Sequence, residues 1–350
     1  MSLYFYLILS VFLLLAQFFL LLALAWRKQR VTAKEQAINE QYEALADLFS
    51  SYMVDPSDDE FIKEIRNTEH QTVVLERLLN GYVAVTKGGV TSPLVAKLSQ
   101  DFLSGHYAKQ LVNKNWAIRM NTLYNIEDFH IESLKPILKE KLDKSSQLDQ
   151  EAQQLIRTLS SLNEPSTISV LARYPDAPVR LYTDVFKRLE ERTRHEELDA
   201  ALRDETHNKA LKHAAIAYIG MAGLFAFLPR IEEELKTQDE ELRIQALKAI
   251  FHLGYLTDPS LLAPFLQSSS WPERMYACRI AGKLQLSRFK EALSVLLGDP
   301  VWWVRYSAAE ALVQFSDGDI LLTHLSADHP DRFARDMAAQ WKSSLLGSET

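Results

Sequence analysis

The sequence predicts an all-α protein, a solenoid of about eight helical hairpins preceded by one transmembrane helix. Three observations support this prediction. The first 26 residues are almost wholly apolar, a period of about 31 residues follows residue 110, and no run alternates in the manner of a strand. The average of 47% hydrophobic and 24% charged residues therefore hides a membrane segment joined to a water-soluble body.

The transmembrane helix is expected over Leu3 to Trp26. Of the first 26 positions 23 are apolar and none is charged. A helix of 24 residues is about 36 Å long, which is enough to cross a hydrocarbon core of about 30 Å. Arg27, Lys28 and Arg30 follow directly, so the anchor with its basic stop covers residues 1–30. The positive-inside rule then predicts that the N-terminus lies outside and the body lies in the cytoplasm.

A cleaved signal peptide is the alternative interpretation, because Ala23-Leu24-Ala25 has the small-x-small pattern of a cleavage site. A signal peptide carries a basic region before a shorter apolar run. Here the basic residues follow the apolar run and the run is longer, so we expect a permanent anchor.

Residues 31–110 are predicted to be a juxtamembrane helical region or degenerate N-terminal repeats. Apolar spacing predicts helices over 31–53, roughly 61–86 and 93–102, with Gly88-Gly89 as a turn. The acidic segment 55–60 breaks the first of these and supplies capping carboxylates for the next helix. A metal site is the alternative for this acidic segment.

A repeat dominates residues 111–346, which we predict to be the solenoid. Basic residues recur with gaps of 61, 32, 31, 31, 31 and 30, the first gap being nearly two periods: Arg119, Arg180, Lys212, Arg243, Arg274, Arg305 and Arg335. Three residues after each comes a small residue, and an apolar residue follows four later in most repeats. Such a face packs closely on neighbouring helices, and stacked hairpins build one continuous core.

The segment LLGDPVWWVRYSAAEALVQF, residues 296–315, carries a resemblance to a known family. It is similar to the second helix of a HEAT repeat of the short bacterial type named after phycobilisome lyases. Asp299, Val304, Arg305, Ala308 and Leu312 occupy the places of that pattern. The resemblance covers about residues 110–345 and implies an α-solenoid in which the arginine and the turn aspartate tie adjacent hairpins together. It thus implies inter-repeat structural roles for Arg119, Arg180, Lys212, Arg243, Arg274, Arg305 and Asp299.

Aromatic residues mark a candidate partner-binding surface. Trp116, Trp271 and Trp302 each lie three residues before the basic residue of their repeat. One interpretation is that these indoles pack as staples at the start of their helices. The other is a recognition patch, because two adjacent tryptophans cannot both face a core. That patch would consist of Trp302, Trp303, Tyr306, Arg274, Arg279 and Lys248.

Patterns of catalytic and cofactor chemistry are missing from the sequence. The nine histidines form no pair at ligand spacing on one helical face, and Cys278 is the single cysteine. No phosphate-binding glycine loop occurs; Gly220-Met221-Ala222-Gly223 is interpreted as a turn between helices. A net charge of −7 argues against nucleic-acid binding. We therefore expect no cofactor, no metal and no nucleic acid.

The sequence thus predicts a non-catalytic adaptor that is anchored in the bacterial inner (cytoplasmic) membrane through residues 3–26. Its partner is expected to be a protein, for instance another inner-membrane protein. Two alternatives remain: a lyase or other enzyme acting at the membrane, and a solenoid that binds an anionic ligand or nucleic acid along its row of basic residues.

Overall fold

The computed structural model describes residues 3–86, 92–171, 173–174, 176–203 and 209–347, and these form α-helices, short 3₁₀ turns and connecting loops. The predicted all-α solenoid is confirmed, with twenty α-helices in the described residues. The chain divides into two compact units, Met1–Ser145 and Ser146–Thr350. The boundary predicted at residue 110 falls inside the first unit, at the end of α5 (Ser104–Gln110).

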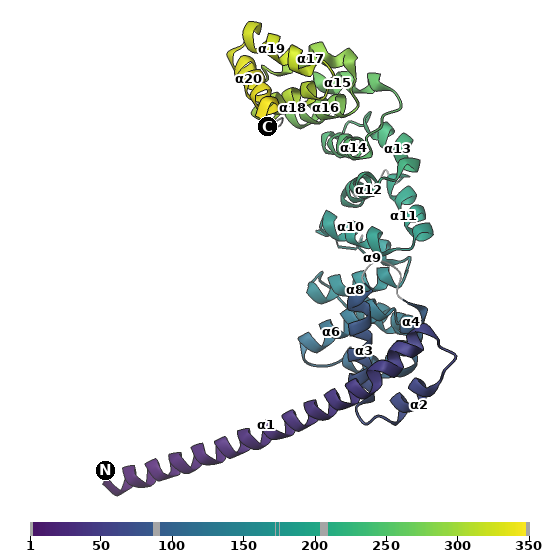
Figure 1. Cartoon of the computed structure of the whole chain (residues 1–350), viewed down its shortest axis with the longest axis vertical. Helices are drawn as coiled ribbons and strands as arrows, with labels where there is room; N and C mark the ends of the chain where they lie inside the picture. The colour runs from purple at the N-terminus through teal and green to yellow at the C-terminus, as the bar shows by residue number, and fades with distance from the viewer. Residues whose placement is uncertain (1–2, 87–91, 172, 175, 204–208, 348–350) are drawn as a thin grey trace. The chain divides into compact units, whose positions relative to one another are not determined.

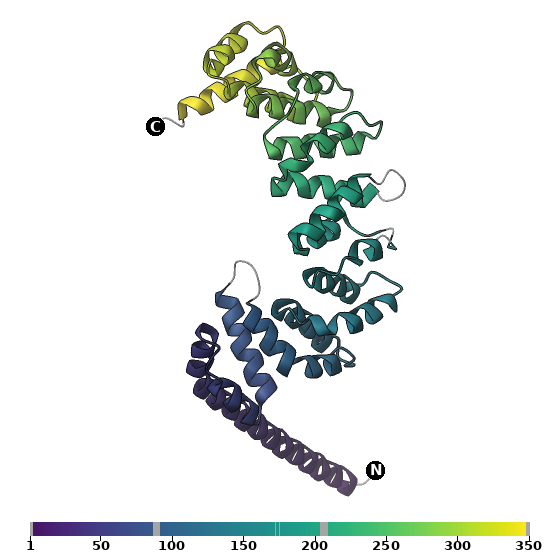
Figure 2. The same cartoon turned by 90° about the vertical axis from the view of Figure 1, so that its right-hand side faces the viewer.

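The apolar N-terminal segment is part of a much longer helix than the sequence predicts. Helix α1 runs without a break over Leu3–Val54, where we expected an anchor and a separate helix (Figures 1 and 2). The physical reason is that residues 3–54 contain no glycine or proline, and the first proline is Pro56. None of its apolar segment is buried against the rest of the chain, whereas Ile38 is buried in the first unit.

Aromatic contacts hold the C-terminal part of α1 in the first unit. Phe49 lies 5.4 Å from Phe61 of α2 (Glu60–Asn67) and 6.1 Å from Tyr82 of α3 (Gln71–Val85), measured between ring centroids. Arg77 of α3 donates a hydrogen bond of 2.7 Å to Glu35 of α1. The polar half of α1 is therefore an integral part of the unit.

Two expectations for residues 55–89 need correction or qualification. The helix predicted over 61–86 is two helices, α2 and α3, because Thr68 adopts an extended conformation between them. Gly88-Gly89 lies outside the described residues. In the acidic segment, backbone N–H groups of Ser57 and Glu60 donate to Asp55 and Asp58, each at 3.0 Å. The Ser57 side chain and then its backbone N–H, both hydrogen-bonded to Asp55, lower the pKa of that carboxyl. Asp58 accepts from the first residue of α2, whereas the expected capping bond from the N-cap residue Asp59 does not form.

The remainder of the first unit consists of α4 (Pro93–Phe102), as predicted, then α5, α6 (Trp116–Phe129) and α7 (Lys135–Asp143). Buried polar contacts join these helices. Tyr107 of α5 donates to Glu76 of α3 at 2.9 Å, and burial together with that carboxylate raises the pKa of Tyr107. Ser99 of α4 donates to the carbonyl of Phe129 at 3.2 Å.

The second unit stacks helices in two rows (Figure 1). One row lies on the concave side of this unit and comprises the second helix of each hairpin: α8 (Gln150–Ser161), α10 (Val179–Arg188), α12 (Lys209–Ala222), α14 (Glu240–Leu253), α16 (Trp271–Lys283), α18 (Trp302–Val313) and α20 (Arg332–Gly347). The outer row comprises α9 (Thr167–Leu171), α11 (Glu191–Arg203), α13 (Leu228–Glu234), α15 (Ala263–Leu266), α17 (Lys290–Leu296) and α19 (Gly318–Asp328).

Small residues let the second helices approach closely. A Cβ on Gly220 of α12 would lie 2.6 Å from the Cα of Ala249 in α14, and one on Gly282 of α16 would lie 2.5 Å from the Cα of Ala311 in α18. The segment 220–223, which we interpreted as a turn, is mostly helical, because α12 continues to Ala222. Only Gly223 leaves the helix, with a φ of +67°.

The small residue of each repeat faces the core. The side chain three residues after each basic position is buried, except that of Thr183, which is half-buried. The buried ones are Thr122, Ala215, Ala246, Ala277, Ala308 and Ala338. Apolar residues four positions later are buried as well. This repeat therefore marks the packing face of the second helices.

Replacing Ala246 by aspartate should destabilise the second unit, because Ala246 is 0% exposed. We expect a loss of about 3 kcal/mol or more from an unpaired buried carboxylate. Denaturant unfolding of the full chain, followed by circular dichroism, measures this loss. Ala263→Asp is the matched control, since Ala263 is exposed at the start of α15. Equal stability of the two variants would refute the assignment of the packing face.

Candidate interaction surface

The basic residue of most repeats is the fourth residue of a second helix or, in the first unit, of α6. From that position its guanidinium reaches back over the preceding loop and donates to the carbonyl six residues earlier. The distances are 2.8 Å for Arg119 to Asn113, 3.0 Å for Arg243 to Thr237, 2.7 Å for Arg274 to Ser268, 2.8 Å for Arg305 to Asp299 and 2.6 Å for Arg335 to His329. The arginines thus fix the loop between the two helices of a hairpin.

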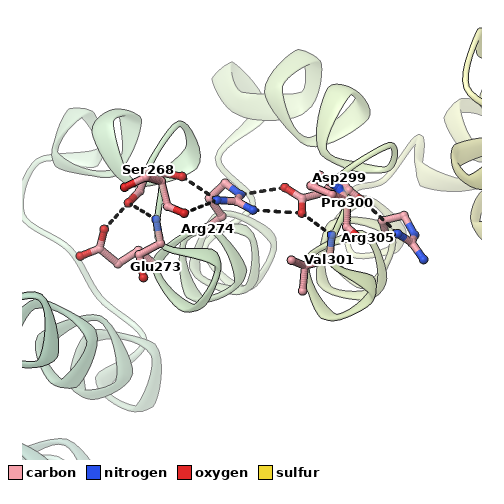
Figure 3. A network of polar contacts seen from close by, with 9 residues as sticks. Ser268, Glu273, Arg274, Asp299, Pro300, Val301 and Arg305 are labelled. Carbon is pink, nitrogen blue, oxygen red and sulfur yellow. Dashed lines mark hydrogen bonds and ion pairs between the residues drawn. The ribbon is translucent and has the colours of Figure 1, made fainter.

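Arg274 also joins its hairpin to the next one. Its Nε and Nη2 atoms donate to the two carboxylate oxygens of Asp299 at 2.7 and 3.1 Å, a bidentate pair in which the aspartate side chain is 4% exposed. Asp299 also accepts from the N–H of Val301 at 2.8 Å in the turn just before α18. Figure 3 shows the resulting chain of contacts from Ser268 to Arg305.

Glu273 takes the place of the aspartate one repeat earlier, a role that the repeat pattern does not predict. Ser268 lies 31 residues before Asp299, so a hydroxyl stands where the turn carboxylate is expected. Glu273, which is 2% exposed, supplies the carboxylate instead. It accepts from Arg243 at 2.6 Å and from the Ser268 hydroxyl. In the sequence, the only indication of this role is that a glutamate directly precedes the repeat arginine Arg274.

Other repeats use different side chains for the same two tasks. Lys212 forms an ion pair with Glu234 at 2.7 Å, and both side chains are largely buried. In α8, Gln153 holds the fourth position and its amide donates to the carbonyl of Leu148 at 3.2 Å. Arg157 of α8 contacts Asp184 of α10 at 3.3 Å. An amide can therefore replace the basic residue that the sequence lacks near residue 150.

Arg180 differs from the other basic residues of the series. It is the second residue of α10, not the fourth, and its side chain is exposed. The fourth position is occupied by Tyr182, which is buried. The expected inter-repeat role of Arg180 therefore needs correction: the spacing of 32 residues to Lys212 hides a shift of the helix start by two residues.

The tryptophans lie at the first position of their helices and are partly exposed, with exposed fractions of 47% for Trp116, 41% for Trp271 and 43% for Trp302. Trp302 contacts Trp303 and Tyr306, with ring centroids 4.7 and 5.1 Å apart. Tyr306 continues to Trp341 of α20 at 5.0 Å. Trp341 is not predicted from the repeat pattern, because it follows the repeat arginine, whereas the other tryptophans precede theirs.

The three basic residues of the predicted patch separate into two groups. Arg274 belongs to the buried pair with Asp299 and does not contribute an open cation. Arg279 lies over the Phe251 ring at 4.5 Å and 3.6 Å from Glu310. Lys248 lies 5.7 Å from the centre of the Tyr276 ring. Of these two cations, Lys248 lines a groove of about 530 Å³ between α14 and α16.

This surface consists of exposed aromatic rings with cations and carboxylates beside them. In the part of the chain that the structure describes, no three His, Cys, Asp or Glu side chains are placed to hold a metal ion. Cys278 is buried in α16, and burial together with the charge of Asp299 raises the pKa of its thiol. Exposed aromatic rings with nearby cations are the residue types that dominate the energetics of protein interfaces.

These features define an all-α helical repeat solenoid with a long apolar N-terminal helix. Residues 259–341, from the start of the 3₁₀ turn before α15 into α20, match the family of HEAT repeats. This stretch contains Arg274, Asp299, Arg305 and the aromatic residues from Trp271 to Trp341. No curated protein matches the sequence.

Several solved structures are similar to this chain. An engineered protein is 14% identical over 86% of this chain and 87% of its own, with a TM-score of 0.40. A designed armadillo repeat protein is 17% identical over 60% and 99%, with a TM-score of 0.34. The complex of CpcE and CpcF of phycocyanin lyase from Nostoc sp. PCC7120 is 14% identical over 74% and 96%, with a TM-score of 0.29.

Replacing Arg274 by methionine should leave the Asp299 carboxylate buried without its cation. We expect the free energy of unfolding to fall by about 3–5 kcal/mol. The rate at which a disulfide reagent labels Cys278 should rise in parallel, because that thiol becomes accessible only when α16 opens.

The matched control is Arg305→Met. The Nη1 of Arg305 donates to the carbonyls of Asp299 and Pro300, and no ion pair with a carboxylate is recorded for it in the described residues. Loss of such a bond costs about 1 kcal/mol. If the two variants unfold and label alike, the buried pair contributes nothing beyond the loop contact.

Proposed function

We propose that this protein is a membrane-anchored, non-catalytic scaffold whose solenoid binds a protein partner at the cytoplasmic face of the bacterial inner membrane. The observation that carries the proposal is α1. Its apolar segment is unburied, and among the described residues it is the one helix long and apolar enough to cross a membrane. The same helix then packs through Ile38 and Phe49 into the first unit.

The partner is proposed to be a protein because of the concave row of second helices. HEAT repeats commonly act in protein–protein interaction, and residues 259–341 match that family. This stretch presents Trp302 and Trp303, which are 43% and 54% exposed. Two adjacent exposed indoles favour burial against a second protein surface.

The proposed topology rests on Arg27, Lys28 and Arg30, which come directly after the apolar segment of α1. A fluorescent reporter fused after Thr350 should be active, and alkaline phosphatase fused there should be inactive, because the phosphatase needs an oxidising compartment. Inserting three lysines before Leu3 and replacing Arg27, Lys28 and Arg30 by glutamine should reverse both signals. Strong phosphatase activity of the unaltered fusion would refute the cytoplasmic location.

Replacing Trp302 and Trp303 by alanine should weaken partner recovery from cross-linked membranes by about tenfold or more, since hot-spot residues each contribute about 2 kcal/mol. The helical circular dichroism signal should stay unchanged, because both rings are partly exposed. Phe225→Ala is the control for loss of an exposed ring, since Phe225 is 55% exposed outside the row of second helices. Equal partner recovery by the unaltered protein, the double tryptophan variant and the Phe225 control would contradict the proposed surface.

A further inference from the structure

The groove between α14 and α16 has an ordered arrangement of charge. Glu240 and Glu241 lie at the start of α14, and Lys248 lies two turns further along the same helix. The side chain of Glu241 is 69% exposed. In the described residues no ion pair is recorded for Lys248, whose ammonium group lies 5.7 Å from the Tyr276 ring. One end of the groove is therefore acidic and the other basic.

The floor between these ends is apolar. Trp271, Pro272, Met275 and Tyr276 of α16 line it opposite Ile244 of α14. Met275 and Tyr276 are half-buried, and the Trp271 ring is 41% exposed. Grooves lined by aromatic rings are the sites that accept polyproline II segments, whose backbone is already ordered.

The spacing of the charges sets the register of an occupant. Glu241 and Lys248 are seven residues apart, about 10 Å along α14. Three residues of polyproline II span about 9 Å and bring the first and fourth side chains to the same face.

We propose that this groove binds a polyproline II segment of the partner protein that carries a basic and an acidic residue three positions apart. The basic side chain would meet Glu240 and Glu241, and the acidic one would meet Lys248. The two residues between them would pack on Trp271 and Tyr276. This inference rests on the proposed function and names the chemistry of the partner.

Site-specific photo-cross-linking tests the occupant. A benzophenone amino acid replaces Gln245, which lines the groove, in the full chain in native membranes. Separate proteins carry it at Trp303 and, as an outer control, at Ile320, which is 69% exposed on α19. Mass spectrometry should place the Gln245 cross-link in one partner segment with the stated charge spacing and a proline. A segment without that spacing, a helical segment or a lipid adduct would overturn the inference.

The outcomes for the two proposals are distinguishable. Capture of a protein from Trp303 with none from Gln245 overturns the groove inference and leaves the scaffold function standing. Capture from neither position counts against both. A cross-link of equal yield at Ile320 shows nonspecific proximity and also overturns the groove inference.

Charge variants test the contact at Lys248. A labelled synthetic peptide of the cross-linked segment is titrated against the full chain in detergent micelles, with fluorescence anisotropy as the readout. Lys248→Glu should weaken binding tenfold or more, and Lys248→Arg should keep it within about twofold. Reversing the acidic residue of the peptide to lysine should restore binding to Lys248→Glu. Unchanged affinity for Lys248→Glu, with the circular dichroism signal intact, would overturn the inference.

Discussion

The stacking of hairpins depends on the polar groups of the loop that precedes each second helix. The carbonyls of such a loop lie where two hairpins meet, and unpaired carbonyls there are costly. Arg274 solves both parts of the problem, because it donates to the Ser268 carbonyl within its own hairpin and to Asp299 of the next. A buried ion pair adds little net stability compared with apolar packing. We infer that its main effect is to fix the register between neighbouring hairpins.

Close helix packing follows from the same register and determines which residues face outward. Gly282 against Ala311 leaves no room for a Cβ, so α16 and α18 approach along one defined line. With the small residues turned inward, the first, second and fifth positions of these helices turn outward. Trp271, Trp302 and Tyr306 occupy such positions. The exposed aromatic surface is thus a geometric consequence of the tight core.

The repeated sequence pattern predicts the helices and their buried faces, but it does not predict which side chain replaces a missing residue of the pattern. The period of 31 residues correctly predicts an all-α solenoid and the buried face of Ala246 and Ala277, because helix periodicity is local information. Glu273 was missed because its role depends on a guanidinium 30 residues away. Spacing alone also placed Arg180 in the series, although its helix starts two residues later than the series requires. Three-dimensional contacts decide which of several polar side chains satisfies a given carbonyl.

Because α1 is continuous, the proposed anchor would restrain the orientation of the first unit. A flexible linker would let the solenoid reorient freely, whereas a helix without glycine or proline transmits orientation. Residues 27–37 lie between the apolar segment and the first buried contact at Ile38, a helical length of about 16 Å. In the proposed setting this stem holds the first unit at a set distance from the bilayer. The buried side chains of Ile38 and Phe49 then couple the orientation of that unit to the stem. A membrane partner of this unit would therefore meet a surface of defined height and direction.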